Sequence, residues 1–200
     1  MLFSWTETEK VVEQNCDRDL INAFRRGSHK AFEILYTRYK RRLYVYAYSL
    51  LKSESEAEEA MQDVFMKLIS NTEAFVETDD ISPLLFTVCR NYCFNLVKRR
   101  NLAKKQSDDP RFQILEEDSP LKTVAEREEA QILNEIIGSL PAEQREVLVM
   151  KVYGGLTFKQ IAQTVGEPQG TVATRYRSAI EKVKLALQAQ GGGTWMRIEK

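Results

Sequence analysis

The spacing of two cysteines raises the question of metal binding. Cys89 and Cys93 lie one helical turn apart, so they could supply half of a zinc site. A complete site needs a second pair of Cys or His ligands, and the single histidine, His29, lies far away in the sequence. The sequence also contains no glycine-rich phosphate loop and no serine or cysteine nucleophile with a histidine partner in view. We therefore expect buried structural thiols and a protein that is not an enzyme, with no catalytic residue, metal or cofactor.

The segment from residue 157 to 187 has a pattern typical of sequence-specific DNA binding. A short amphipathic helix, a glycine-containing turn and a longer helix follow one another, as in a helix-turn-helix motif. Small hydroxyl and basic side chains at the start of the longer helix suit base edges in the major groove and the flanking phosphates. The polar side of that helix and its edges carry Thr171, Thr174, Arg175, Arg177 and Ser178. The same periodicity fits an αα-hairpin that only packs on its neighbours, so this alternative stays open.

A second candidate nucleic-acid surface lies on the helix predicted over residues 83–100. Its outward side combines the ring of Phe94 with the polar groups of Arg90, Asn91 and Lys98. Single-stranded nucleic acid needs such a combination, because a ring stacks on an exposed base while polar groups bind base edges and cations neutralise phosphates. The alternatives are that the loop over residues 71–80 covers Phe94 and that the basic end only complements the helix dipole.

The helix predicted over residues 57–69 presents a candidate protein-docking surface. Its outer face carries acidic side chains, among them Glu59 and Asp63, around the flexible apolar side chain of Met66. Such a face suits the binding of another protein. On these residues alone, an ordinary solvated helix face is the favoured interpretation.

Helices must position all of these residues, since apolar side chains recur at spacings of three and four along most of the chain. Gly27 predicts a break between a short helix and a longer one. Ser53 stands three residues before Glu56, and Ser55 stands three before Glu58, both of which are capping-box spacings. The apolar periodicity of the next two helices places Ile69 and Leu84 on their inward faces. The expected fold class is all-α, with two small helical domains joined by an acidic linker. The second domain is expected to be a helix-turn-helix domain of winged-helix-like or four-helix type.

Composition sets the expected boundaries of these parts. The first domain is predicted over residues 17–102 and the second over residues 124–189. Residues 103–123 have little apolar periodicity and several acids and prolines, which is typical of a linker. The glycine-rich end, residues 190–200, is expected to be a flexible tail.

The formal net charge of zero hides a segregation of charge along the chain. The sequence contains 29 Lys and Arg residues and 29 Asp and Glu residues. Residues 98–105 hold five basic side chains, whereas residues 106–129 hold eight acidic side chains against three basic ones. Neutrality of the whole chain therefore does not exclude a nucleic-acid partner.

The first ten residues have neither a basic start nor an apolar run, so we expect no signal or transit peptide. No stretch approaches the ~18 consecutive apolar residues of a membrane helix. We expect a cytoplasmic protein that is not inserted in a membrane.

Several motifs, in their order along the chain, resemble those of bacterial RNA polymerase sigma factors. Asp-Leu-Ile at residues 19–21, Ala-Phe-Glu-Ile-Leu-Tyr at residues 31–36 and Ala-Glu-Glu-Ala-Met-Gln-Asp-Val-Phe at residues 57–65 resemble sigma region two. Leu-Pro at residues 140–141 and the segment from Gly155-Leu156-Thr157 to Gly170-Thr171-Val172 resemble region four. Because only a short tether separates the two regions, the chain resembles the extracytoplasmic-function group.

The resemblance implies a function for each candidate surface. It implies a sigma factor that binds core RNA polymerase and directs promoter recognition and transcription initiation. The residues that match the surface for the clamp helices of the largest polymerase subunit are Glu59, Gln62, Asp63 and Met66. Those that match the reader of the promoter −10 element are Arg90, Asn91, Phe94, Lys98, Arg99 and Arg100. Those that match the reader of the −35 element are Thr157, Thr171, Thr174, Arg175, Arg177 and Ser178.

The implied partners are the polymerase core, including its flap, promoter DNA and, in some members of the group, an anti-sigma factor. Two other hypotheses are compatible with the residues themselves. One is a stand-alone helix-turn-helix regulator that does not depend on core polymerase. The other is an adaptor that binds a protein through its acidic helix and never contacts DNA.

Overall fold

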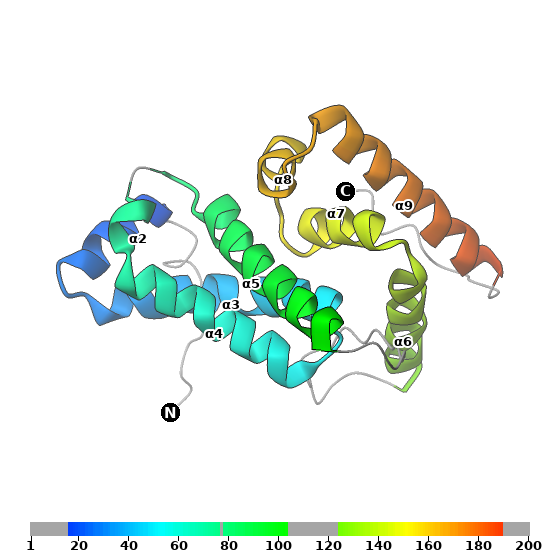
Figure 1. Cartoon of the computed structure of the whole chain (residues 1–200), viewed down its shortest axis with the longest axis horizontal. Coiled ribbons are helices and arrows are strands. Elements are labelled where there is room, and N and C mark those ends of the chain that lie inside the picture. The colour runs from blue at the N-terminus through cyan, green and yellow to red at the C-terminus, as the bar shows by residue number, and fades with distance from the viewer. Residues whose placement is uncertain (1–15, 77, 104–123, 190–200) are drawn as a thin grey trace, which may run out of the picture.

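The computed structural model describes residues 16–76, 78–103 and 124–189, with side chains described for 16–76, 78–100 and 132–189. The predicted linker at residues 103–123 and the tail at residues 190–200 lie outside it, apart from Ala103, the last residue of a helix. All regular structure in the described residues is helical (Figure 1), so the all-α prediction is confirmed. The elements are α2 (Asp17–Arg25), α3 (His29–Leu51), α4 (Glu54–Ser70), η1 (Thr72–Phe75), α5 (Ser82–Ala103), α6 (Val124–Ser139), α7 (Ala142–Val152), α8 (Phe158–Val165) and α9 (Gln169–Ala189).

The first helical unit is built around α3, which packs against α2, α4 and α5. Its core contains the fully buried side chains of Leu35, Leu43, Leu68 and Leu85. The predicted break before α3 is confirmed, since α2 ends at Arg25 and Gly27 adopts a positive φ of 93°, which suits a residue without a Cβ atom.

The start of α4 corrects one detail of the sequence analysis. Ser53 is the N-cap residue, but its side chain makes no capping hydrogen bond. The capping box predicted for Ser53 and Glu56 is therefore wrong, although the helix boundary is right. Glu56 instead forms an ion pair with Arg100 of α5.

The second helical unit contains α6, α7, α8 and α9, with α9 packed against the other three. Thr157 caps α8 through a complete capping box with Gln160, and Gly166 ends α8 in the left-handed conformation, with φ of 74°. No strand lies between residues 124 and 189, so this unit corresponds to the four-helix form of the expectation.

The two units contact each other directly. Helix α7 lies against α3, and α8 lies against α5 (Figure 1). Within the residues that the structure covers, none of the helices combines the length and hydropathy needed to cross a bilayer.

Candidate protein and nucleic-acid interfaces

The outer face of α4 exposes an acidic and apolar surface. Glu59, Gln62 and Met66 are exposed, and Met66 has 62% of its surface accessible. Asp63 is half-buried on the same helix and forms an ion pair with Lys67 at 2.7 Å. The predicted docking residues thus share one helix and reach the surface, which is the geometry needed to contact another protein.

The last turn of α4 differs from the sequence prediction. Ile69 was expected to face inward but is 43% exposed, one turn beyond Met66. The helix ends one residue later, at Ser70. Met66 and Ile69 together therefore make the exposed face more apolar than predicted.

Helix α5 presents Asn91, Phe94, Lys98 and Arg99 to solvent. Phe94 is 46% exposed, so the loop over residues 71–80 does not cover its ring. The guanidinium of Arg90 lies 4.3 Å from the centre of that ring, which is a cation–π contact. Leu84, expected to face inward, is 39% exposed on this helix.

Two of the residues predicted to bind the −10 element form ion pairs within the chain. Arg90 is half-buried and forms an ion pair with Glu146 of α7 at 2.9 Å. Arg100 forms an ion pair with Glu56 and donates a hydrogen bond to the Leu51 carbonyl at 3.1 Å. These two guanidinium groups hold neighbouring helices, whereas Lys98 and Arg99 extend from the end of α5.

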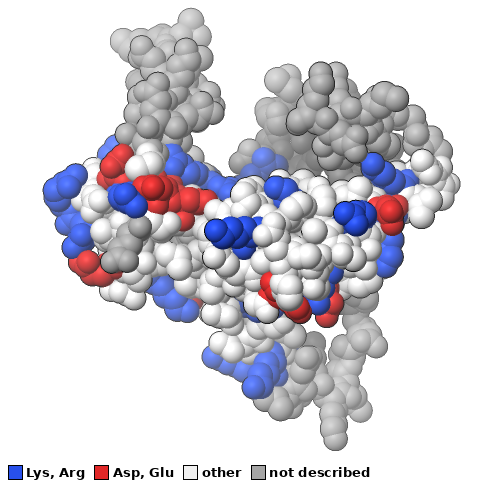
Figure 2. All heavy atoms as spheres, turned by 90° about the horizontal axis from the view of Figure 1, so that it is seen from above, with Lys and Arg blue, Asp and Glu red and all other residues white. Residues whose placement is uncertain are grey.

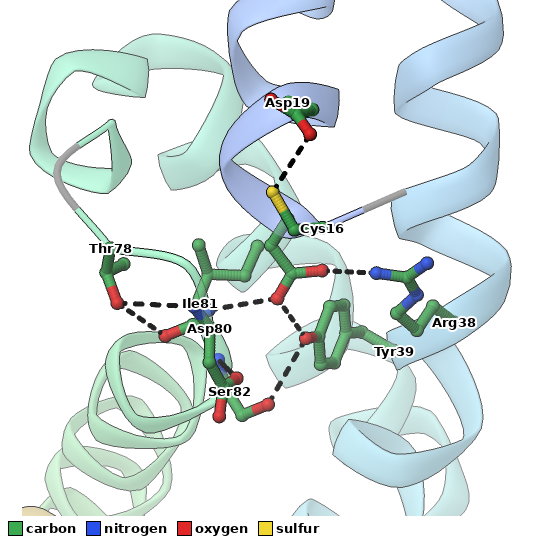
Figure 3. A network of polar contacts seen from close by, with 9 residues as sticks. Cys16, Asp19, Arg38, Tyr39, Thr78, Asp80, Ile81 and Ser82 are labelled. Atoms are coloured by element: carbon green, nitrogen blue, oxygen red, sulfur yellow. Dashed lines mark hydrogen bonds and ion pairs between the residues drawn. The ribbon is translucent and has the colours of Figure 1, made fainter. Parts of the chain in front are cut away.

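A buried carboxylate holds the beginning of α5 in place (Figure 3). Asp17 is 3% exposed and accepts hydrogen bonds from Arg38 at 2.6 Å, from the Tyr39 hydroxyl at 2.5 Å and from the Ile81 backbone N–H at 3.0 Å. Burial, with the hydrogen bond to Asp17, raises the pKa of Tyr39 above its usual range. Ser82 donates to the Tyr39 hydroxyl at 3.2 Å, so the network links α2, α3 and the first residue of α5.

Sequence reasoning did not find this network. An acid such as Asp17 in the first turn of a helix is ordinary, so its type and position alone do not mark it. Its partners lie 21, 22 and 64 residues away in the sequence, so no local pattern marks them.

Asp80 is a second carboxylate near the start of α5. It accepts hydrogen bonds from the Ser82 backbone N–H at 2.9 Å and from the Gln160 amide at 2.6 Å. Burial acts to raise its pKa, but the hydrogen bonds from Ser82 and Gln160 and the charge of Arg42 outweigh burial and hold the pKa below its usual value.

The helix-turn-helix residues fall into two groups. Thr157, Thr174 and Arg177 are exposed, while Thr171, Arg175 and Ser178 are half-buried. The structure brings all of them to α8 and α9 and the ends of those helices.

Arg175 has a structural role within the motif. Its guanidinium forms ion pairs with Glu143 of α7 and with Glu167 in the turn before α9, both at 3.0 Å. It therefore fixes the start of α9 relative to α7, and Arg177 is the arginine of this pair that extends into solvent.

The two cysteines of α5 are fully buried, as predicted for structural thiols. A hydrogen bond with Cys93, together with burial, raises the pKa of the Cys89 thiol well above its usual value. Such a thiol is a poor nucleophile and a poor metal ligand, because both roles need the thiolate.

Charges of both signs are interspersed on the face shown in Figure 2. Small groups of Lys and Arg alternate there with small groups of Asp and Glu. This face therefore offers no single extended basic surface of the kind that gives strong non-specific DNA binding.

The comparison with known families finds two matches in the expected order. Residues 35–102 match the family described as Sigma-70 region 2, and residues 130–183 match Sigma-70, region 4. The first match contains most of α3, all of α4 and all but the last residue of α5, and the second contains α7, α8 and most of α9.

Curated relatives cover nearly the whole chain. The RNA polymerase sigma-H factor of Pseudomonas aeruginosa is 26% identical over 189 residues, which is 89% of this chain and 97% of that protein. The ECF RNA polymerase sigma factor SigW of Bacillus subtilis is 24% identical over 84% of this chain and 95% of that protein.

Two solved structures share the fold. The sigma factor RpoE in complex with the anti-sigma factor NepR from Bartonella quintana aligns with a TM-score of 0.64 and 20% identity, over 80% of this chain and 98% of that one. CnrH in complex with the cytosolic domain of CnrY aligns with a TM-score of 0.61 and 22% identity, over 86% and 97% of the two chains.

Proposed function

The chain belongs to the sigma-70 family of RNA polymerase sigma factors, in its extracytoplasmic-function group, and from that membership we propose which of its surfaces binds core polymerase and which surfaces bind promoter DNA. The first unit binds core polymerase and the −10 element, and the second binds the −35 element. Membership of this family replaces the hypothesis of a stand-alone regulator. The observation that carries the proposal is that both sigma-70 matches coincide with helices that expose the expected side chains.

The polymerase-binding surface is the outer face of α4. Glu59, Gln62, Asp63 and Met66 lie on it, and Met66 has 62% of its surface exposed. An exposed apolar side chain among polar ones is a typical centre for a binding hot spot, because its burial excludes water from the surrounding contacts. The partner of this face is the clamp of the largest polymerase subunit, and region four binds the flap.

The DNA-binding surfaces are α5 and α9. Asn91 and Phe94 offer hydrogen bonds and a stacking ring to unpaired bases, with Lys98 and Arg99 near the backbone, while Arg90 and Arg100 hold neighbouring helices. Thr171, Thr174, Arg177 and Ser178 face the −35 duplex, while Thr157 and Arg175 hold the helices that carry them. The domain boundaries are residues 17–102 and 124–189.

The protein acts in the cytoplasm as an initiation factor with no catalytic residue and no cofactor of its own, since the polymerase supplies the chemistry. One of the two structural neighbours, RpoE, was solved in complex with the anti-sigma factor NepR. An anti-sigma factor is therefore a partner of this chain as well.

A pull-down with purified core polymerase tests the central proposal. We expect wild-type protein to bind core and Met66→Arg to reduce binding at least tenfold, because the charge cannot be buried at the centre of an apolar contact. Glu33→Arg is the matched control, since it changes an exposed acid on α3 that forms only a surface ion pair with Lys30. Wild-type protein that fails to bind core would contradict the proposal, and so would undiminished binding by Met66→Arg.

Run-off transcription with the same core on genomic fragments extends the test to promoters. Transcripts that depend on the protein are expected to start downstream of one shared pair of sequence elements. An adaptor that never contacts DNA would give no such transcripts.

A further inference from the structure

The segment over residues 78–82, which leads into α5, is held by contacts along its length. The Thr78 hydroxyl donates a hydrogen bond to the Asp80 carbonyl at 2.8 Å, and the Asp80 carboxylate accepts one from the Ser82 backbone N–H at 2.9 Å. The Ile81 side chain is fully buried. The path of the segment is therefore fixed before α5 completes its first turn.

Two helices of the first unit anchor this segment through one chain of hydrogen bonds (Figure 3). Asp17 of α2 accepts from the Ile81 backbone N–H at 3.0 Å and from the hydroxyl of Tyr39 of α3 at 2.5 Å. The same hydroxyl accepts a hydrogen bond from Ser82 at 3.2 Å, so it lies between the carboxylate and the first residue of α5. All of these residues are buried, which keeps water from competing for the bonds.

The anchored end of α5 is also the start of its exposed face. Leu84, in the first turn, is 39% exposed, and Asn91 and Phe94 follow on the same side of the helix. Leu85 and Phe86 are fully buried and fix the rotation of the helix about its axis. Because an α-helix is stiff over this length, the placement of its first turn sets the direction in which the exposed side chains point.

Fixed placement matters for a surface that binds unpaired bases. Unpaired DNA is flexible, so holding it costs conformational entropy, and a protein surface that is already ordered adds no second cost. Asp17, Tyr39 and Ser82 supply this order from buried positions. Their effect on DNA therefore passes through the segment and the first turn of α5.

We propose that Asp17, Tyr39 and Ser82 are positioning residues for the capture of unpaired −10 bases, because they hold the start of α5 in the orientation that its exposed face needs. The proposal rests on the proposed function, which assigns α5 to the −10 element. Loss of this chain of hydrogen bonds weakens the step in which −10 bases become unpaired and are held. It leaves the binding of core polymerase and of the −35 duplex unchanged, whereas a general loss of folding would weaken all three.

Amide hydrogen exchange on the isolated protein tests the anchor without DNA. Tyr39→Phe keeps the ring but removes the hydroxyl that Asp17 and Ser82 share. We expect several-fold faster exchange of the Ile81 backbone N–H in this variant, because the segment opens more often, and unchanged exchange of the Leu43 backbone N–H in the middle of α3. Unchanged exchange at Ile81 would overturn the anchor.

Promoter opening tests the function of the anchor. Holoenzyme assembled from the full chain and core polymerase is mixed with a promoter found by run-off transcription, in which 2-aminopurine within the −10 element reports unpairing by its fluorescence. We expect Tyr39→Phe and Ser82→Ala to lower the equilibrium constant for opening about three- to tenfold, the scale of one lost hydrogen bond. Binding to a −35 duplex, measured by anisotropy, is expected to stay unchanged. Tyr44→Phe is the matched control, since it makes the same change at a half-buried position of α3, and it is expected to open the promoter like the wild type.

A double-mutant cycle separates positioning from a general loss of stability. Because the two hydroxyls act through the bond between them, Ser82→Ala is expected to have no further effect on opening in the Tyr39→Phe background. Ile34→Val removes a buried methyl group from α3 and lowers stability without changing the network, so we expect it to leave opening unchanged. Additive effects of the two hydroxyl substitutions would overturn the shared path, and reduced opening by Ile34→Val would assign the effect to stability.

The controls distinguish failure of this proposal from failure of the proposed function. Wild-type protein that binds core and opens the promoter, with Tyr39→Phe and Ser82→Ala opening it equally well, would overturn only the positioning role. Wild-type protein that neither binds core nor opens any promoter would contradict the proposed function instead.

Discussion

The buried carboxylate of Asp17 links α2 to α3 and to the segment before α5. Its carboxylate accepts three hydrogen bonds from groups of α3 and of the segment before α5, and it is almost fully buried. A buried acceptor with several donors cannot be removed without leaving those donors unsatisfied. At the residue scale, Asp17 therefore determines where α5, and with it the proposed −10 surface, begins.

Asp17→Ala is expected to lower the free energy of unfolding by about 1–3 kcal/mol, because it removes a buried acceptor that Arg38, the Tyr39 hydroxyl and the Ile81 backbone N–H share. Chemical unfolding followed by circular dichroism measures this loss. Asp19→Ala, two residues further along α2 at an exposed position, is expected to change stability by less than about 0.5 kcal/mol. Equal effects of the two substitutions would show that the network contributes nothing specific.

The two arginines of α9 are expected to respond differently to substitution. Arg177→Ala should weaken binding of the polymerase complex to −35 DNA by about 1–3 kcal/mol without lowering stability, because its side chain is exposed and faces the proposed duplex. Arg175→Ala should lower thermal stability, because Glu143 and Glu167 lose their shared partner. Fluorescence anisotropy on a promoter found by run-off transcription, together with thermal unfolding, separates the two effects. A stability loss in Arg177→Ala with unchanged DNA binding would reverse these assignments.

At the scale of the elements, helix caps show both the strength and the limit of local patterns. Thr157 and Gln160 have the spacing of a capping box and form one. Ser53 and Glu56 have the same spacing, yet Glu56 pairs with Arg100 of another helix and the Ser53 side chain makes no capping bond. The spacing defines where a helix begins, whereas neighbouring helices decide which bonds its side chains make.

The two caps predict a contrast in stability. Thr157→Ala is expected to cost about 0.5–2 kcal/mol, because it leaves the Gln160 backbone N–H without its acceptor. Ser53→Ala is expected to cost less than about 0.5 kcal/mol, since no capping bond is lost. Denaturant unfolding of both variants measures the difference, and a larger loss at Ser53 would contradict the assignment of the caps.

At the scale of the whole molecule, the contact between the units includes a buried phenol, Tyr46, that donates its proton to a hydrogen bond with Glu146. Burial and the neighbouring Glu146 carboxylate raise the pKa of Tyr46 well above its usual value. In the unfolded chain a tyrosine titrates near pH 10. The unfolded state therefore loses this proton at lower pH than the folded state does, and the resulting stability is complete below about pH 10 and lost as the pH rises further.

Tyr46→Phe is expected to reduce the alkaline loss of stability. Wild-type protein should lose stability as the pH rises above about 10, and the variant should lose less because one raised pKa has been removed. Tyr39, whose pKa is also raised, remains in both proteins, so the comparison isolates Tyr46. Denaturant midpoints at several alkaline pH values measure the effect, and parallel profiles for the two proteins would contradict it.

The sequence by itself determined the helices, their order, the break at Gly27, the cap at Thr157 and the family to which the chain belongs. These features depend on hydrogen bonds and side-chain contacts between residues a few positions apart, so they leave a periodic or spaced pattern. The exposed residues of α4 and α9 followed from the same periodicity, while Ile69 and Leu84 did not, because exposure near the end of a helix depends on what packs there.

Only the tertiary structure decided which polar side chains form hydrogen bonds with residues of other helices. Tyr46 and Glu146 are 100 residues apart, Arg90 and Glu146 are 56 apart, and Asp80 and Gln160 are 80 apart. A single carboxylate at position 146 is ordinary on a helix, and nothing near it in the sequence marks its burial. Contacts of this range follow from how the two units pack, because apolar burial brings them together and the polar groups caught in the contact must then find partners there.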